Sequence, residues 1–190
     1  NEDKAAVAEA ITAEAVKLAG YDSMDAAAED GTAFVFMGHG TSHTANVTYD
    51  QMQTQLEKLN YKNAFVGTVE GEPEDTACEA VIEKVKEAGY KKVILRPLMV
   101  VAGDHANNDM AGDDEDSWKS QFEASKAFDS VDTQIEGLGR IKAVQDIYVA
   151  HTKAALEAEP LATAGGSNSS AALEDGTYTV DSVSYTHLRA

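Results

Sequence analysis

The sequence is poor in cysteine, in basic residues and in long apolar runs, and each shortage excludes a class of protein. Its 190 residues include a single cysteine, Cys78, so no internal disulfide can form. No segment approaches the roughly 20 consecutive apolar residues of a membrane-spanning helix, so we expect no membrane insertion. Lys and Arg number 15 against 33 Asp and Glu, which gives a formal net charge of -18. Such acidity argues against nucleic acid and anionic membrane surfaces as partners.

A lone cysteine is either a buried apolar side chain or a reactive thiol. Cys78 lies in a segment whose apolar residues have helical spacing, TACEAVIEKV. No activating partner is evident near it in the sequence, so the thiol is predicted to pack as a small hydrophobic group.

Segments with strand character alternate along the chain with segments of helical character. We predict strands over 32–37, 63–69, 92–101 and 131–138, and helices over 3–19, 44–59, 73–88, 118–128 and 141–158. A polar connection follows the first helix, and a long polar loop covers 102–116. Short, continuously apolar strands separated by helices are typical of a parallel sheet covered on both faces. The sequence therefore predicts one three-layer α/β/α domain over about 1–159, with a four-stranded parallel sheet.

The composition changes after this domain. Residues 160–175 are small, polar and rich in Gly and Ser, which is typical of a flexible linker. The segment 176–190 begins with GTYTVDSVSYT, whose alternation is typical of a half-exposed strand. We expect this segment to be either the start of a truncated β segment or a disordered tail.

Polar clusters follow the first three predicted strands, where a parallel α/β sheet binds its ligands. His39 follows the first strand, Glu70 the second and His105 the third. Two imidazoles and one carboxylate suit a divalent first-row metal such as cobalt, nickel, zinc or iron, and three protein ligands leave positions open for a substrate. Taken singly, each histidine could be a hydrogen-bonded structural residue and Glu70 could cap a helix. Their equivalent positions together favour a metal or catalytic site.

Other residues near these clusters have weaker signals. Gly38 and Gly40 flank His39 and would let the chain turn sharply and a flat ligand approach closely. His43 could contact the metal-binding residues without binding the metal itself, whereas we expect no functional role for His151 or His187.

Two short motifs resemble known binding loops without matching them. The acidic run at 113–116 fails the calcium-loop spacing, so it is predicted to be a solvated loop that caps a helix beginning at Ser117 or Trp118. The GLGR sequence at 137–140 is too short to count as a dinucleotide-binding fingerprint.

Four stretches of the chain closely resemble the anaerobic cobaltochelatase family: FMGHGT at 36–41, TVEG at 68–71, PLMVVAGDHANNDMAGD at 97–113 and DSWK at 116–119. The third stretch is long and highly specific, and the resemblance extends over about 3–159. It implies a chelatase-like fold of two similar α/β domains with a cleft between them. It also implies a lyase-type activity, the insertion of Co(II) into sirohydrochlorin during anaerobic cobalamin biosynthesis.

The resemblance assigns roles to residues of this sequence. It implies that His39, Glu70 and His105 are both the metal ligands and the catalytic residues. Co(II) is then the metal substrate, sirohydrochlorin the tetrapyrrole partner, and no organic cofactor is expected. Because sirohydrochlorin carries several carboxylates that an acidic protein repels, local cations should help to bind it. The expected substrate contacts are Gly38, Gly40, Thr41, Arg96 and Lys119.

The sequence departs from the family pattern in one respect, because the family has a further α/β domain before the region seen here. We therefore expect the C-terminal domain of a longer chelatase. Two alternatives stay open: an iron or nickel chelatase of the same fold, and a non-catalytic tetrapyrrole- or metal-binding module of an exported protein. The resemblance implies a cytoplasmic location, whereas the linker and tail favour an extracytoplasmic or cell-surface one. A homo-oligomer is compatible with all of these.

Overall fold

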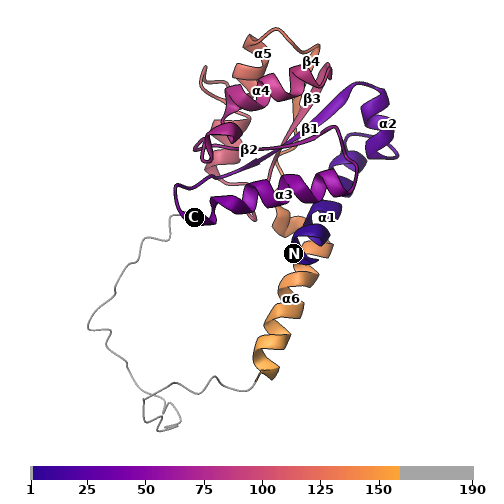
Figure 1. Cartoon of the computed structure of the whole chain (residues 1–190), viewed down its shortest axis with the longest axis vertical. Coiled ribbons are helices and arrows are strands. Elements are labelled where there is room, and N and C mark those ends of the chain that lie inside the picture. The colour runs from indigo at the N-terminus through magenta and orange to yellow at the C-terminus, as the bar shows by residue number, and fades with distance from the viewer. Residues whose placement is uncertain (1, 159–190) are drawn as a thin grey trace, which may run out of the picture.

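The computed structural model describes residues 2–158 as a parallel sheet flanked by helices (Figure 1). The strands are β1 (Thr32–Gly38), β2 (Ala64–Thr68), β3 (Lys92–Pro97) and β4 (Ser130–Thr133), and they lie in the order β2-β1-β3-β4. The helices are α1 (Glu2–Leu18), α2 (Met24–Glu29), α3 (Val47–Lys58), α4 (Cys78–Glu87), α5 (Trp118–Ala124) and α6 (Lys142–Glu157). The predicted α/β class and four-stranded parallel sheet are confirmed. The predictions for 160–175, 176–190 and His187 lie outside the described residues.

Strand β1 is the centre of the fold, since it pairs with β2 on one side and β3 on the other. All of its residues are buried. Alternate side chains of a strand point to opposite faces, and here Phe34 and Phe36 join a core that includes side chains of α1 and α3. Val35 and Met37 join a second core with side chains of α4 and α5. The apolar run over 32–38 is therefore continuous because both faces of the strand are covered.

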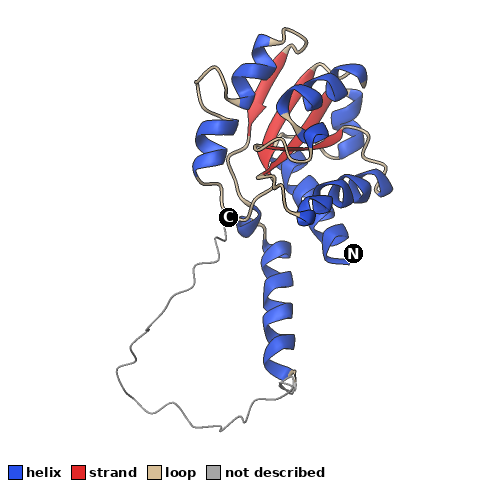
Figure 2. Cartoon of the chain, turned by 60° about the vertical axis from the view of Figure 1, so that its left-hand side comes forward, coloured by secondary structure: helices blue, strands red, loops and turns tan. Residues whose placement is uncertain are grey.

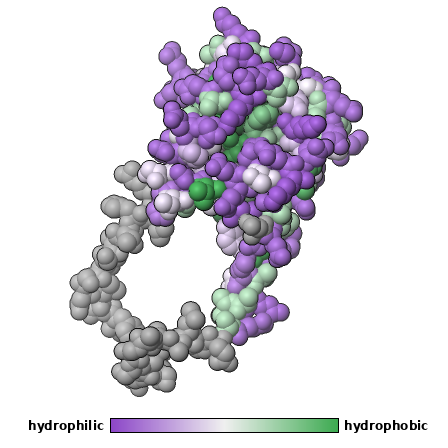
Figure 3. Space-filling view, in the orientation of Figure 1, coloured by the Kyte–Doolittle hydropathy of each residue, from purple (hydrophilic) through white to green (hydrophobic). Residues whose placement is uncertain are grey.

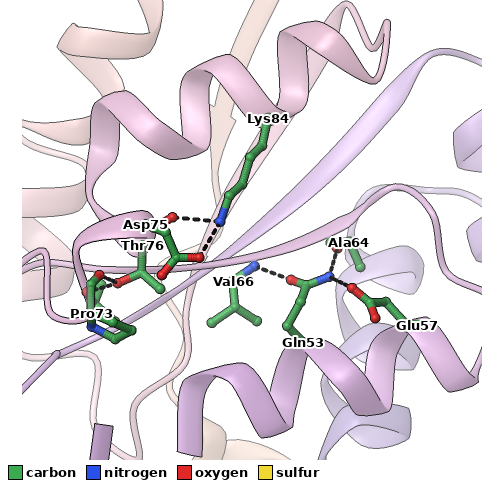
Figure 4. Close-up of polar contacts among 9 residues, drawn as sticks. Gln53, Glu57, Ala64, Val66, Pro73, Asp75, Thr76 and Lys84 are labelled. Atoms are coloured by element: carbon green, nitrogen blue, oxygen red, sulfur yellow. Dashed lines mark hydrogen bonds and ion pairs between the residues drawn. The ribbon is translucent and has the colours of Figure 1, made fainter. Parts of the chain in front are cut away.

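The outer edge of β2 is covered by a side chain of α3. The Gln53 side-chain oxygen accepts a hydrogen bond from the Val66 amide at 2.9 Å, and its nitrogen donates to the Ala64 carbonyl at 3.2 Å (Figure 4). An open strand edge is a template for pairing with another chain. Gln53 occupies that edge and so protects the β2 side of the sheet.

Helix α6 is the least covered helix and extends away from the sheet (Figure 2). Val144 is its buried residue, whereas Tyr148, Val149 and Leu156 are exposed. His151 pairs with Asp3 of α1 at 2.9 Å on the surface. Within residues 2–158, no helix has both the length and the apolar character needed to cross a membrane.

The third and fourth strands are shorter than predicted. β3 ends at Pro97, which is paired with Met37 as the last register pair between β1 and β3. The apolar run that follows instead pairs with a later turn, where the Gly139 amide donates to the Val100 carbonyl at 2.9 Å. β4 ends at Thr133, and the chain then leaves the sheet toward a 3-10 turn over Leu138–Arg140.

Several helical elements also differ from the prediction. The loop predicted over 102–116 contains a π-helix, η3 (His105–Met110). The polar connection predicted after the first helix contains α2, which Ser23 caps by accepting from the Ala26 amide. The helices predicted from 44 and 73 begin with 3-10 turns, and α5 ends before the predicted residue 128.

Two local predictions are confirmed. The Ser117 hydroxyl caps α5 by accepting a hydrogen bond from the Ser120 amide at 3.2 Å. Cys78 is buried in the core beneath α4, and burial raises the pKa of its thiol well above the ordinary value. A protonated, covered thiol is a poor nucleophile.

Candidate metal centre

The strand order brings the ends of β1 and β3 next to each other. The chain leaves β1 for β2 on one side and later adds β3 on the other side, so the connections diverge between β1 and β3. Ligands of open α/β sheets bind beyond the strand ends at such a point. His39 directly follows β1, and His105 begins η3 after β3. Their rings meet edge to face, with centroids 4.6 Å apart and planes at 86°.

The His39 ring is oriented by the backbone of its own loop. Its Nδ1 lies 2.9 Å from the Gly40 carbonyl oxygen. A carbonyl can only accept, so Nδ1 carries a proton, and in the neutral ring Nε2 then keeps its lone pair. The Gly40 amide in turn donates to the Tyr49 hydroxyl at 2.8 Å, which fixes the peptide that orients the imidazole.

The His105 ring is oriented by a carboxylate one helical turn later. Its Nδ1 lies 2.5 Å from Asp109 Oδ2. An ionised carboxylate only accepts, so in the neutral ring the proton again lies on Nδ1 and the lone pair on Nε2. Outer carboxylate or carbonyl partners of this kind hold metal-binding histidines in position. Sequence reasoning missed Asp109 because the segment was predicted to be a loop; in a helix, the four-residue spacing would have paired the two side chains.

Two glycines allow the His39 loop to pack tightly. A Cβ on Gly38 would lie 2.5 Å from a ring carbon of Tyr49, and one on Gly40 would lie 2.9 Å from Glu70 Cβ. Gly40 also has a φ of +93°, which L side chains rarely adopt. The sharp turn predicted for this loop is therefore present, and close packing against the loop that carries Glu70 requires it.

Glu70 lies beside His39, although its carboxylate is not gathered with the two imidazoles. The Glu70 amide donates to the His39 carbonyl at 2.9 Å, and both residues line a pocket of about 320 Å³. The Glu70 side chain is exposed. Among residues 2–158 no three His, Cys, Asp or Glu side chains converge on one point that could hold a metal ion. The predicted trio is thus a preformed histidine pair with a carboxylate on a neighbouring loop.

The loop that carries Glu70 is held in shape by its own polar contacts. Thr76 donates to the Pro73 carbonyl at 2.5 Å, and its hydroxyl also contacts that of Thr68 at 2.5 Å. Lys84 of α4 binds the Asp75 carboxylate at 2.9 Å (Figure 4). These contacts hold the backbone of the segment that follows Glu70, whose own side chain is exposed.

The sequence also matches a known protein family. Residues 10–157 match the family model described as Cobalt chelatase (CbiK). The chain belongs to the cobalt chelatase family. It is 42% identical over 122 residues to a sirohydrochlorin cobaltochelatase of Salmonella typhimurium, across 64% of this chain and 44% of the relative. It is 34% identical over 126 residues to sirohydrochlorin cobaltochelatase CbiKC of Nitratidesulfovibrio vulgaris, across 66% of this chain and 43% of the relative.

These alignments concern part of each relative. The chain spans less than half the length of the curated cobaltochelatases that it matches. Its histidine pair and the loop that carries Glu70 lie inside the residues that match the family model.

The cations predicted to bind substrate do not line the histidine pocket of this family member. Arg96 is 0% exposed, so the expected direct contact with a substrate is not supported. Its Nη1 donates to Gln134 Oε1 at 2.8 Å, and Nη2 lies 3.8 Å from a Glu136 carboxylate oxygen. Burial lowers the pKa of the guanidinium, while Glu136 and Glu14 oppose that shift. The position of Arg96 in the motif does not reveal which face of β3 it occupies, so the sequence alone does not show that the guanidinium is enclosed.

The two remaining candidates near the site have local partners. Lys119 of α5 pairs with Asp113 at 3.6 Å. His43 caps the 3-10 turn that begins at Thr44, because its Nδ1 accepts from the Ala45 amide at 3.1 Å. The geometry therefore gives His43 a structural role in the loop.

Proposed function

We propose that this chain is the metal-binding part of a sirohydrochlorin cobaltochelatase and that His39 and His105 hold the Co(II) substrate through Nε2. The observation that carries the proposal is the contact between the two imidazoles, in which each Nδ1 is already satisfied by another partner. Neutral imidazole suits cobalt and other first-row divalent ions. The names of the relatives support cobalt as the metal and sirohydrochlorin as the tetrapyrrole.

Glu70 is the proposed third member of the site. Metal insertion replaces two pyrrole N–H protons with one divalent ion, so the protein must both deliver the metal and accept protons. The exposed Glu70 side chain shares a pocket with His39 and can rotate toward the imidazoles, since only its backbone is fixed. It would act there as a third ligand or as the proton acceptor. Two imidazoles and one carboxylate leave coordination positions for the tetrapyrrole nitrogens.

The loop after β1 is the proposed platform for the substrate. Gly38 and Gly40 keep it close to the neighbouring loop, and Thr41 lies at the edge of the histidine pocket. Lys119, which is half-buried beside Asp113, is retained as a proposed contact to a substrate carboxylate. Arg96 is not, because its guanidinium is enclosed.

The proposal also concerns the organisation of the protein. We take residues 1–159 to be the C-terminal α/β domain of a cobaltochelatase, since a match to less than half of each relative fits one of two similar domains. The cytoplasmic location that the resemblance implies stays a prediction, which cell fractionation would test.

The decisive experiment is a Co(II) titration of the chain followed by visible d–d absorption. His39→Ala and His105→Ala are each expected to weaken Co(II) binding strongly. The loss should exceed the roughly 10- to 100-fold that is typical when a residue hydrogen-bonded to a metal ligand is replaced. His151→Ala is the matched control, because it removes an exposed imidazole on α6. Co(II) binding that is unchanged in both site variants would overturn the proposal.

Two further measurements separate the functions within the family. Competition by Fe(II) and Ni(II) in the same titration establishes metal preference, because ligand type alone barely distinguishes these ions. Formation of cobalt-sirohydrochlorin, followed by its absorption spectrum, distinguishes a chelatase from a module that only binds. Glu70→Gln should retain most Co(II) binding but slow metallation if Glu70 accepts protons.

A further inference from the structure

A second pocket lies on the same rim of the sheet as the histidine pair. Its volume is about 600 Å³, and its walls include Val100 and Val101 after β3 and Ile135 and Arg140 after β4. Asn107 of η3 also lines it, so the helix that carries His105 forms one side of the pocket. None of the residues predicted to bind substrate lies in its wall.

Part of the pocket wall consists of exposed aliphatic side chains, on a molecule whose surface is mostly hydrophilic in the view of Figure 3. Val101 is 72% exposed, Val100 47% and Ile135 43%. Aliphatic side chains gathered around a recess favour a ligand with a flat apolar face. The same valines were predicted to be buried in a strand, and the early end of β3 is what presents them to solvent.

Arg140 supplies a positive charge beside the aliphatic side chains of this pocket. It ends the 3-10 turn over Leu138–Arg140, and its side chain is exposed. Within residues 2–158 it takes part in no ion pair, although acidic residues outnumber basic ones by 33 to 15 in the whole chain. A guanidinium binds carboxylates by paired, charge-assisted hydrogen bonds. The pocket therefore offers an apolar surface and a carboxylate receptor together.

The buried Arg96 explains why Arg140 stays available. Glu136 also lines the pocket and would otherwise attract Arg140 and repel an anionic ligand. Arg96 lies beneath it, with Nη2 3.8 Å from the Glu136 carboxylate. This buried cation offsets part of the charge of Glu136, and Arg140 is the exposed cation among the residues that line the pocket.

The turn that presents Arg140 is preformed. The Leu138 amide donates to the Met99 carbonyl at 2.8 Å, which ties the turn to the chain after β3. A Cβ on Gly137 would lie 2.5 Å from the Val100 carbonyl oxygen, so only glycine permits this approach. The GLGR sequence is thus the means by which Arg140 is held over the valines.

We propose that this pocket binds the carboxylate-bearing edge of the tetrapyrrole, with Arg140 pairing a side-chain carboxylate and Val100, Val101 and Ile135 contacting the ring. The identity of the tetrapyrrole rests on the proposed function, whereas the pocket itself does not depend on the metal ligands. The proposal replaces Arg96 by Arg140 as the cation that opposes the acidic field of the protein.

The test is a titration of metal-free sirohydrochlorin into the chain, followed by tetrapyrrole absorbance. Arg140→Gln should weaken binding by roughly tenfold, the effect expected for one charge-assisted hydrogen bond. Lys142→Gln is the matched control, since it removes an exposed cation two residues away that already pairs with Asp146. Val101→Asp should also weaken binding, because it places a carboxylate against the ring.

A second ligand makes the interpretation specific. Sirohydrochlorin with esterified carboxylates should bind the native chain and Arg140→Gln equally, because the ester offers no charge to pair. Circular dichroism of each variant establishes that the fold is intact. Equal affinities of Arg140→Gln and Lys142→Gln for the free acid would overturn the proposal. So would an Arg140→Gln variant that loses as much affinity for the ester as for the free acid. Absence of tetrapyrrole binding by the native chain would also overturn it.

The Co(II) titration distinguishes the two proposals. Histidine-dependent Co(II) binding together with an Arg140-independent tetrapyrrole affinity would remove the pocket assignment and leave the metal site. An Arg140-dependent tetrapyrrole affinity without Co(II) binding would support the pocket assignment and remove the metal site.

Discussion

The Asp109 carboxylate lies 2.5 Å from Nδ1 of His105, four residues earlier in the same π-helix. The contact holds the imidazole in place and, in the neutral ring, leaves the lone pair on Nε2, while the ring meets that of His39 edge to face. His39 achieves the same state through the Gly40 carbonyl. The group that orients His105 is a charged carboxylate, whereas the group that orients His39 is a neutral carbonyl. Asp109 should therefore affect the binding of a cation more than the Gly40 carbonyl does.

Replacement of Asp109 should weaken Co(II) binding although Asp109 contacts no metal in the proposed site. We expect Asp109→Ala to reduce Co(II) affinity by roughly 10- to 100-fold, as is usual for loss of a histidine's outer partner, and Asp109→Asn to have a smaller effect. The shape of the cobalt d–d spectrum should change as His105 loses its fixed orientation. Asp113→Asn is the control for the loss of one negative charge, since Asp113 is fully exposed and its ion-pair partner among the described residues is Lys119. An equal effect of both substitutions would contradict a positioning role.

A methyl group at Gly40 should damage the site more than a methyl group at Gly89. Both glycines have positive φ, +93° and +86°, so each substitution carries a backbone penalty of about 1–3 kcal/mol. Gly89 has no atom within 4 Å of an added Cβ, whereas Gly40 would meet Glu70 and Thr68 at 2.9–3.0 Å. Urea denaturation should show a larger loss of stability for Gly40→Ala, and Co(II) binding should fall in that variant alone. Similar denaturation midpoints for the two variants would argue against tight packing between the loops.

Arg96 should contribute to stability through its enclosed contacts. Arg96→Ala leaves a cavity and removes the hydrogen bond to Gln134 Oε1, so we expect a loss of roughly 3 kcal/mol in the free energy of unfolding. Arg96→Met fills most of that volume and should be less destabilising, because two guanidinium nitrogens have no hydrogen-bond partner to lose. The fluorescence of Trp118, the single tryptophan and a buried one, reports unfolding of both variants. Equal destabilisation by Ala and Met would mean that charge, rather than volume, dominates at this position.

The thiol of Cys78 should resist alkylation in the folded protein. Burial raises its pKa, so the reactive thiolate is scarce at neutral pH and stays scarce above the ordinary thiol pKa of about 8.5. Iodoacetamide should therefore modify the native chain far more slowly than the urea-unfolded chain at pH 8, as followed by mass spectrometry. Rapid native labelling at that pH would show that the helix α4 region opens readily.

The sequence was a good guide where a single residue pattern determines the structure. The apolar run over 32–38 predicted β1 because that strand is covered on both faces, and the following GHG placed His39 correctly at its end. The pattern failed for 98–101, where exposed valines resemble a buried strand. Whether an apolar residue is buried depends on the elements that pack beside it. The pairing between β1 and β3 ends at Pro97, and Val100 and Val101 beyond it are exposed.

The polar side chains were harder to place for the same reason. Arg96 and Arg140 are both arginines next to motif residues, and the sequence favoured the one that the fold encloses. The face of β3 that Arg96 occupies, and the return of 137–139 over Val100, are consequences of long-range packing. The Asp109–His105 pair depends on the helical geometry of this segment, which the sequence does not predict.

The central position of β1 has a consequence for how the protein opens. Amide exchange within β1 requires separation of the strands on both of its sides, whereas α6, with Val144 as its buried anchor, can detach by itself. The loop that carries His39 continues directly from this most protected strand, and His105 follows the neighbour to which β1 is paired. The two imidazoles should therefore stay in register through partial openings at the periphery, and their capacity to bind cobalt should be lost only when the sheet itself unfolds.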